Sequence, residues 1–230
     1  MVGIIGAMDM EVDALAADMQ DKSIVEKAGM CFVAGKLSGQ DAVVVKSGVG
    51  KVNAAICAQV LVDVFNVDTL INTGVAGALD AALNVGDLVV SKDAVHHDID
   101  ATGIGIPKGQ VPYMSVMSFP AAEKLIELAM EANKKANPEV QTSVGRVVSG
   151  DVFVNSRALK EALVSQFDGT CAEMEGAAIA HVAYLNQVPY VILRAISDKA
   201  DDSADVDFPT FAAKAAVRST RLVEEMLGMM

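Results

Sequence analysis

Two kinds of hydrophobic pattern, one typical of strands and one typical of helices, alternate along the whole chain. Short apolar runs rich in β-branched residues predict strands, namely "GIIGA", "CFVAGKL", "DAVVVKSG", "TLINTG", "DLVVS", "SVGRVVSG" and "YVILRAIS". Between them, apolar positions recur every three to four residues and predict helices over Val52–Phe65, Pro120–Lys135, Ser156–Gln166, Gly176–Asn186 and Phe208–Leu227. Ser156 is of the residue type that caps a helix N-terminus. Strands alternating with helices predict an α/β fold, with helices flanking a mixed, mostly parallel central sheet.

Nothing in this pattern divides the chain. It contains no internal repeat, low-complexity tract or linker, so we expect a single domain over residues 1–230. The least regular stretch, residues 100–119, reads "DATGIGIPKGQVPYMSVMSF". Its Gly and Pro content and its length are typical of a lid or of a loop that contacts another subunit.

Composition narrows the class of partner. With 30 Asp and Glu against 18 Lys and Arg and a net charge of −12, the chain lacks the basic surface that nucleic acids and anionic lipids require. A hydrophobic content of 52% gives a large core and an excess that suits an oligomer. No apolar run reaches the roughly 18 residues of a membrane span. Three separated cysteines fit a reducing compartment. We therefore expect a soluble, cytoplasmic protein with a small-molecule ligand.

Ligands of α/β folds bind at the carboxyl ends of the strands, and three of these ends carry ambiguous signals. Glu11 follows "GIIGAMDM" in the first turn of a helix, where an acid can simply complement the helix N-terminus. Gly74 and Gly77 in "INTGVAGAL" can bring a ligand close to the backbone or form an ordinary turn. Phe153, after a Gly-Asp turn, can stack on a flat ligand or pack in the core.

Four acids at strand ends favour a ligand-binding site over purely structural roles. "CAEMEG", residues 171–176, places Glu173 and Glu175 where a strand gives way to a helix, and "LRAISDKAD" ends a strand on Asp198. Alone, each of these acids could be a cap or a solvated loop residue. Together with Glu11 they lie at the ends of strands of one sheet, and converging carboxylates raise one another's pKa. A protonated acid beside an ionised base is the pair that hydrolyses a glycosidic bond.

Other chemistries are disfavoured. The chain has no G-x-G-x-x-G dinucleotide fingerprint, no G-x-S-x-G elbow and no G-x-x-x-x-G-K-[ST] phosphate loop. His96 and His97 are adjacent on a predicted strand and point to opposite faces, and His181 is on a helix, which disfavours a zinc site. We therefore expect neither a metal nor a cofactor.

Six motifs in this order carry a family resemblance: "GIIGAMDMEV", "KSGVGKVNAA", "INTGVAGAL", "VSGDVFVN", "AEMEGAAIAHV" and "RAISDKAD". They resemble the 5′-methylthioadenosine/S-adenosylhomocysteine nucleosidases, a family of the purine nucleoside phosphorylase/uridine phosphorylase superfamily. The resemblance runs from Val2 to about Leu227 without a large gap. It implies a nucleoside phosphorylase-like fold and a homodimer. It also implies hydrolysis that releases adenine from 5′-methylthioadenosine and S-adenosylhomocysteine, which are both thioethers.

The resemblance also implies roles for individual residues. Asp198 protonates N7 of the adenine or hydrogen-bonds its edge, and Glu11 positions and deprotonates the attacking water. Glu175, beside the Met174 backbone, grips the ribose 2′- and 3′-hydroxyls while the sugar becomes oxocarbenium-like. Phe153 and the Val154 backbone hold the purine, and Arg194 and Glu173 support the acids. The remaining implied site residues are Met8, Val49, Ala76, Gly77, Ser197 and Phe208.

Water is favoured over phosphate as the nucleophile. Phosphorylases of the superfamily bring arginines and a serine to the phosphate, whereas this chain has Asn72 and Val75 at the corresponding positions. Its first arginine is Arg146. A phosphate dianion near Glu11 and Glu175 without an arginine clamp would be poorly stabilised. Val75 also departs from the serine often found in the nucleosidases. A hydroxyl that helps to orient the attacking water must therefore come from another residue, for instance Ser197.

The loop at residues 100–119 is expected to close the partner subunit's 5′-alkylthio pocket through Ile104, Ile106 and Pro112. The family usually has aromatic residues where the two isoleucines stand. The pocket stays apolar, so a thioether substrate is favoured, and the choice between methylthio and homocysteinyl groups is left open. Three alternatives are also left open: a hydrolase of futalosine-type nucleosides, a purine nucleoside phosphorylase, and a noncatalytic nucleoside binder.

Overall fold

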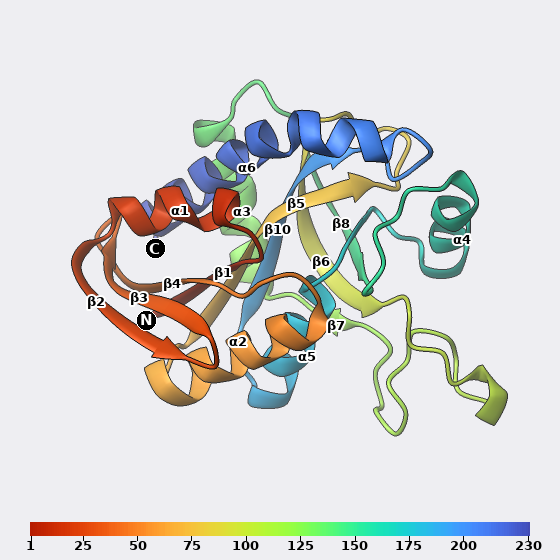
Figure 1. Cartoon of the computed structure of the whole chain (residues 1–230), viewed down its shortest axis with the longest axis horizontal. Coiled ribbons are helices and arrows are strands. Elements are labelled where there is room, and N and C mark those ends of the chain that lie inside the picture. Colours follow the sequence, from red (N-terminus) through yellow and green to blue (C-terminus); the bar gives the residue numbers. More distant parts are fainter.

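The computed structural model describes all 230 residues and joins its strands into one mixed, ten-stranded sheet (Figure 1). The strands are β1 (Val2–Gly6), β2 (Gln20–Lys27), β3 (Met30–Leu37), β4 (Gln40–Lys46), β5 (Thr69–Ala78), β6 (Leu88–His96), β7 (Phe119–Pro120), β8 (Thr142–Ser149), β9 (Cys171–Glu173) and β10 (Tyr190–Asp198). Their order is β10-β6-β8-β9-β5-β1-β4-β3-β2, with β7 beside β6. Because β5 also pairs with β10, the strands β5, β10, β6, β8 and β9 close into a ring.

Helices cover both faces of the sheet. They are α1 (Asp9–Asp18), α2 (Lys51–Phe65), α3 (Glu123–Ala136), α4 (Arg157–Phe167), α5 (Gly176–Asn186) and α6 (Ala204–Gly228), with a short 3₁₀ helix η1 (Thr102–Ile104). One core lies under α1, α3 and α6 and includes Leu15 and Leu222. A second core lies under α2 and α5 on the opposite face and includes Leu61 and Ile179 (Figure 1). The predicted α/β fold with a mixed sheet flanked by helices is confirmed.

Local sequence explains where several helices begin and end. The Ser156 hydroxyl accepts the Leu159 N–H at 3.3 Å, so this residue caps α4 as predicted. Asn66, Asp168 and Gln187 adopt the left-handed conformation that ends α2, α4 and α5. None of the helices combines the length and the apolarity that crossing a membrane requires.

Three strands differ from the sequence-based expectation. β7 was not predicted, because Pro120 was placed at the start of a helix that begins only at Glu123. β2 was not predicted, because all of its residues are exposed and its sequence "QDKSIVEK" shows no alternation of apolar and polar positions. β5 was predicted to stop at a glycine turn, but it continues through Gly74 and Gly77 to Ala78. Pairing with β10 extends as far as Gly77 and supplies the hydrogen bonds that keep this glycine-rich stretch extended.

The same stretch of β5 interrupts the sheet on its other edge. There β1 pairs with residues 69–72 and β9 pairs with Gly77 and Ala78, so residues 73–76 have only β10 as a neighbour. The carboxyl ends of β1, β9 and β10 therefore meet beside a segment of β5 that is paired on one edge only. Such a break in strand order is where α/β folds bind ligands.

Candidate functional site

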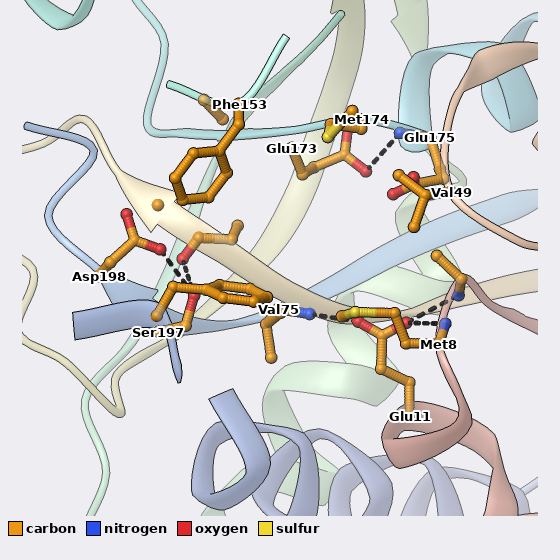
Figure 2. Close-up of a pocket in the computed structure, with 15 residues that line it drawn as sticks. Met8, Glu11, Val49, Val75, Phe153, Glu173, Met174, Glu175, Ser197 and Asp198 are labelled. Carbon is orange, nitrogen blue, oxygen red and sulfur yellow. Dashed lines mark hydrogen bonds between the residues drawn. The ribbon is translucent and has the colours of Figure 1, made fainter. Parts of the chain in front are cut away.

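A cavity opens at this break in the sheet. Among the residues that line it are the predicted Met8, Glu11, Val49, Ala76, Gly77, Phe153, Glu173, Met174, Glu175, Ser197, Asp198 and Phe208. Val154 lines a smaller pocket that adjoins the first one. Arg194 lies outside the lining, fully buried behind Glu173. Figure 2 shows Phe153, Ser197 and Asp198 at one end of the cavity and Met8, Glu11 and Glu175 at the other.

Glu11 is held by three backbone N–H groups. Its Oε2 accepts from Ala7 at 2.7 Å and from Met8 at 3.0 Å, and its Oε1 accepts from Val75 at 3.1 Å on the unpaired edge of β5. The bonds from Ala7 and Met8 satisfy donors at the start of α1, so the helix-capping interpretation of Glu11 describes a real contact. Burial raises the pKa of Glu11, while Arg194 and the three N–H groups oppose that rise. A carboxylate offers about four acceptor positions, which leaves one for a further donor.

Asp198 ends β10 and is 2% exposed. Its Oδ2 accepts the Ser197 hydroxyl at 2.8 Å, and its Oδ1 accepts the Ala200 N–H at 2.8 Å. Burial raises the pKa of Asp198 against both hydrogen bonds. A carboxyl group with a raised pKa keeps its proton closer to neutral pH, which is what a general acid needs. Phe153 and Phe208 meet edge to face near this end of the cavity, with ring centroids 5.7 Å apart.

The two acids of "CAEMEG" have different surroundings. Glu173 ends β9, and its Oε2 accepts the N–H groups of Glu175 at 3.1 Å and Gly176 at 2.7 Å as well as a bond from Arg194. Glu175 is the N-cap residue of α5, and its Oε1 accepts the Gly50 N–H at 2.8 Å. Burial, followed by the nearby Glu173 carboxylate, raises the pKa of Glu175 to about 7. Glu173 is therefore committed to protein contacts, while Glu175 keeps acceptor capacity.

The unfolding free energy should report the raised pKa of Glu175. A folded-state pKa of about 7 against an ordinary value of 4.5 means that the folded state holds this proton more tightly. The resulting stability is present below pH 4.5 and is lost as the pH rises through about 7. Between pH 5 and 8 the wild-type melting temperature should therefore fall relative to that of Glu175→Gln, when both are measured without ligand. Glu123→Gln, at an exposed position, is the matched control and should follow the wild type. If the melting temperatures of wild type and Glu175→Gln ran parallel over this pH range, the raised pKa of Glu175 would be refuted.

Gly74 and Gly77 make room for acids. A Cβ atom at Gly74 would lie 2.6 Å from Glu11 Oε1, and one at Gly77 would lie 2.7 Å from Asp198 Oδ1. Both distances are shorter than van der Waals contact. The glycines were interpreted as a turn or as an approach for a ligand. Their packing shows that each admits one carboxylate to the edge of β5.

Three lining residues were not among the predicted site residues. Ala7 and Ala172 carry no functional group in their side chains, and Val75 was noted only as a departure from the family. Ala7 and Val75 act through their backbone N–H groups, which hold Glu11. Such a role leaves no signal in the side chain. The position of these residues next to the predicted strand ends was the only indication that the sequence offered.

The loop residues lie away from this cavity in the same chain. Ile104 is 70% exposed, and Ile106 and Pro112 are half-buried in a segment that projects from the body of the molecule (Figure 1). Within the chain, these three residues are not brought to the acids. No group of three or more His, Cys, Asp or Glu side chains is arranged to hold a metal ion. All three cysteines are free thiols.

The fold and the cluster of acids at the break in its sheet define the class of protein. The family model of the phosphorylase superfamily matches residues 1–228, so the chain belongs to that superfamily. A 5′-methylthioadenosine/S-adenosylhomocysteine nucleosidase of Staphylococcus aureus (strain bovine RF122 / ET3-1) is 41% identical over 231 residues, with both chains covered in full. Within the superfamily, the chain belongs to the 5′-methylthioadenosine/S-adenosylhomocysteine nucleosidases.

Solved structures agree with this placement. The nucleosidase of Colwellia psychrerythraea 34H, in complex with adenine, has a TM-score of 0.95 at 38% identity, covering 99% of this chain and 94% of that one. The nucleosidase of Neisseria meningitidis, in complex with methylthio-immucillin-A, has a TM-score of 0.96 at 37% identity, covering 100% and 99%. A futalosine hydrolase of Helicobacter pylori is also similar, with a TM-score of 0.94 at 33% identity, covering 100% and 97%.

Proposed function

We propose that this enzyme hydrolyses the N-glycosidic bond of 5′-methylthioadenosine and S-adenosylhomocysteine, releasing adenine and the 5-thio-substituted ribose. One observation carries the proposal: a buried acid of raised pKa, Asp198, lies at one end of the cavity, and Glu11 and Glu175 lie at the other (Figure 2). A purine leaving group and a ribose need these two kinds of surroundings at opposite ends of one site.

At the purine end, Asp198 gives its proton to N7 of the adenine, so that the base leaves as a neutral molecule. The Ser197 hydroxyl and the Ala200 N–H fix the carboxyl group at 2.8 Å each and stabilise the carboxylate that remains. Phe153, which is 41% exposed beside the cavity, offers a ring face to the purine. The neighbouring Val154 backbone lies in the adjoining pocket and can bind the edge of the base.

At the sugar end, Glu175 accepts hydrogen bonds from the 2′- and 3′-hydroxyls, because only one of its oxygens is occupied by the Gly50 N–H. Glu11 uses its remaining acceptor position to bind and deprotonate the attacking water. The negative charge of these two groups also stabilises the positive charge that develops on the sugar as the bond to adenine breaks. Met174, between the two acids of its motif, lines the wall beside the sugar.

The charges around the cavity favour water over phosphate. The cavity lining contains no lysine or arginine. The nearest guanidinium, that of Arg194, already contacts Glu173 and the Asn72 side chain. A phosphate dianion would therefore meet carboxylates without a free cation to neutralise it.

Product analysis tests the proposed function. The enzyme is incubated with 5′-methylthioadenosine, S-adenosylhomocysteine, adenosine or inosine, with and without phosphate, and the sugar product is identified. We expect free methylthioribose at the same rate in both conditions. A sugar 1-phosphate would instead identify a phosphorylase, and binding without turnover would identify a nucleoside binder.

The likeness to a futalosine hydrolase supports a second substrate class, which belongs in the same assay. The lining favours the thioethers, since Met8, Val49 and Phe208 contribute apolar surface. An apolar wall stabilises an alkylthio group and does not pair a polar substituent. Faster turnover of futalosine than of methylthioadenosine would reverse this order.

We also propose that the active unit is a homodimer, with each chain forming a single domain over residues 1–230. The projecting loop exposes Ile104 at 70% and Tyr113 at 98%, an apolar surface that a monomer would leave in water. A stable dimer interface buries about 2,000 Å² or more and is rich in such side chains. In the dimer, Ile104, Ile106 and Pro112 would close the partner's 5′-alkylthio pocket. A cytoplasmic location stays a prediction from the sequence.

Ile104→Asp tests the shared pocket. A carboxylate next to the alkylthio group should weaken binding of methylthioadenosine by about tenfold or more, since burying a charge near an apolar group is costly. Binding of adenosine, which lacks the alkylthio group, should change less. Light scattering at the assay concentration measures the dimer itself. A fully active monomer would refute the dimer, and equal effects on both ligands would refute the shared pocket.

A further inference from the structure

A series of buried polar contacts lies behind the cavity and starts at β1. The Asn72 amide nitrogen on β5 donates to the Ile5 carbonyl at 3.0 Å, and its Oδ1 accepts from Arg194 Nη2 on β10 at 2.6 Å. The same Nη2 contacts Glu173 Oε2 on β9. Asn72 is 1% exposed and Arg194 is 2% exposed, so solvent cannot replace these partners. The guanidinium is thus held between a neutral amide and a carboxylate.

The series continues from Glu173 to α5. The Ser149 hydroxyl on β8 donates to Glu173 Oε1, on the side of the carboxylate away from Arg194. The same hydroxyl accepts the Ala177 N–H at 2.7 Å in the first turn of α5. Ser149 is fully buried. Together with the N–H groups of Glu175 and Gly176, it therefore fixes the rotation of the Glu173 carboxylate, and through it the position of Arg194.

We infer that Asn72 and Ser149 are positioning residues for the proposed hydrolysis, because together they hold the Glu173–Arg194 ion pair and so fix the positive charge that faces Glu11. Glu11 and Arg194 form no ion pair, but both come close to Gly74. A Cβ atom at that position would lie 2.6 Å from Glu11 Oε1 and 3.2 Å from Arg194 Nη1. The two side chains therefore approach each other where this glycine leaves space. The inference rests on the proposed function, in which Glu11 activates water.

The charge of Arg194 matters because it is the cation among three acids. Its guanidinium lowers the pKa of both Glu11 and Glu175 against the effect of burial, and Glu173 is its direct partner. An Arg194 that turned away from Glu11 while keeping its bond to Glu173 would leave Glu11 less stabilised in its ionised form. Glu11 would then be protonated over more of the pH range in which it has to accept a proton from water.

An amide suits position 72 better than other groups of similar size. Its oxygen faces a guanidinium and its nitrogen faces a carbonyl, so only one orientation of the amide satisfies both. A leucine would leave the buried Nη2 without its second acceptor, and an aspartate would lose the donor to Ile5 and add another negative charge. An arginine would place two cations together. Asn72 thus does more than lack the charge that a phosphorylase would use here.

Asn72→Ala should move the pH profile of the enzyme. Without Oδ1, Arg194 Nη2 is left with Glu173 as its only acceptor, and only the backbone carbonyls of Leu193 and Asn72 still hold Nη1. The guanidinium then turns away from Glu11, and the pKa of Glu11 rises. The acid limb of kcat/KM for methylthioadenosine should move to higher pH, and kcat should fall by about tenfold to a hundredfold, the range for a lost hydrogen bond to a charged group. KM should change less, because Asn72 and Arg194 do not line the cavity.

Thr73→Ala is the matched control. Thr73 is the next residue on β5, is 1% exposed, and shares a 2.6 Å hydrogen bond with Ser219 of α6 on the other face of the sheet. Its loss should lower the melting temperature to a similar extent and leave kcat and the pH profile unchanged. Ser149→Ala removes the other end of the series and should lower kcat in the same way. It therefore tests the inference if Asn72→Ala does not fold.

The outcomes separate the inference from the proposed function. If the wild type hydrolyses methylthioadenosine and both variants keep its kcat and pH profile, Asn72 and Ser149 only support the fold and the inference is wrong. A kcat loss with an unmoved profile in Asn72→Ala would also overturn the link to Glu11. A wild type without hydrolytic activity would refute the proposed function and this inference with it.

Discussion

Asp198→Asn is expected to lower turnover by about 10²–10⁴, the contribution of general acid catalysis. The asparagine oxygen can keep the Ala200 N–H, and its nitrogen can donate to Ser197 Oγ, so both hydrogen bonds at this position are retained in kind. The proton for N7 is lost. Adenine must then leave as an anion, which is a far poorer leaving group. Single-turnover rates with methylthioadenosine measure the effect.

Asp202→Asn supplies the control for this change. Asp202 is exposed on the segment after β10, and its Oδ1 accepts the Arg157 N–H at 3.3 Å, which an asparagine can also do. Its activity should equal that of the wild type. If Asp198→Asn kept most of its activity, Asp198 would be a residue that caps the turn at Ala200 rather than the acid.

Glu11→Gln is expected to remove hydrolysis while adenine still binds. The proposed partner of Glu11 is water, and an amide cannot take a proton from it at neutral pH. One of the carboxylate oxygens becomes a nitrogen, so at least one backbone donor among Ala7, Met8 and Val75 loses its acceptor. That loss should lower the free energy of unfolding by about 1–3 kcal/mol without abolishing the fold.

Calorimetric titration with adenine, together with the rate of hydrolysis, measures both parts of this expectation. Asp9→Asn is the control, since Asp9 is exposed in the same first turn of α1 and forms a 2.6 Å ion pair with Lys46 at the surface. Loss of adenine binding together with loss of the fold in Glu11→Gln would make helix capping the main role of Glu11.

Periodicity and strand ends located most of this structure. Helices α3, α4 and α6 were recognised because each has one apolar face. The acids were recognised because a carboxylate directly after a buried strand is unusual. β2 was not predicted, because a fully exposed strand shows no alternation of apolar and polar residues. The close packing of Gly74 against Glu11 and of Gly77 against Asp198 was not predicted, because these acids are remote from the glycines in sequence. Arg194 was assigned to the site from resemblance, and its burial behind Glu173 depends on pairing between strands that no local pattern encodes.

The closed ring of β5, β10, β6, β8 and β9 separates the stability of this protein from its choice of substrate. Sheet hydrogen bonds hold the ring through backbone groups, which are the same whatever the side chains are. The cavity is lined by a few side chains, those of Val75 and Ala76 and of the neighbouring strand ends, where β5 has only one strand partner. Mutations there can alter the preferred nucleoside while the ring continues to fold. A nucleosidase and a futalosine hydrolase can therefore diverge on one scaffold, as the TM-score of 0.94 with the Helicobacter pylori enzyme illustrates.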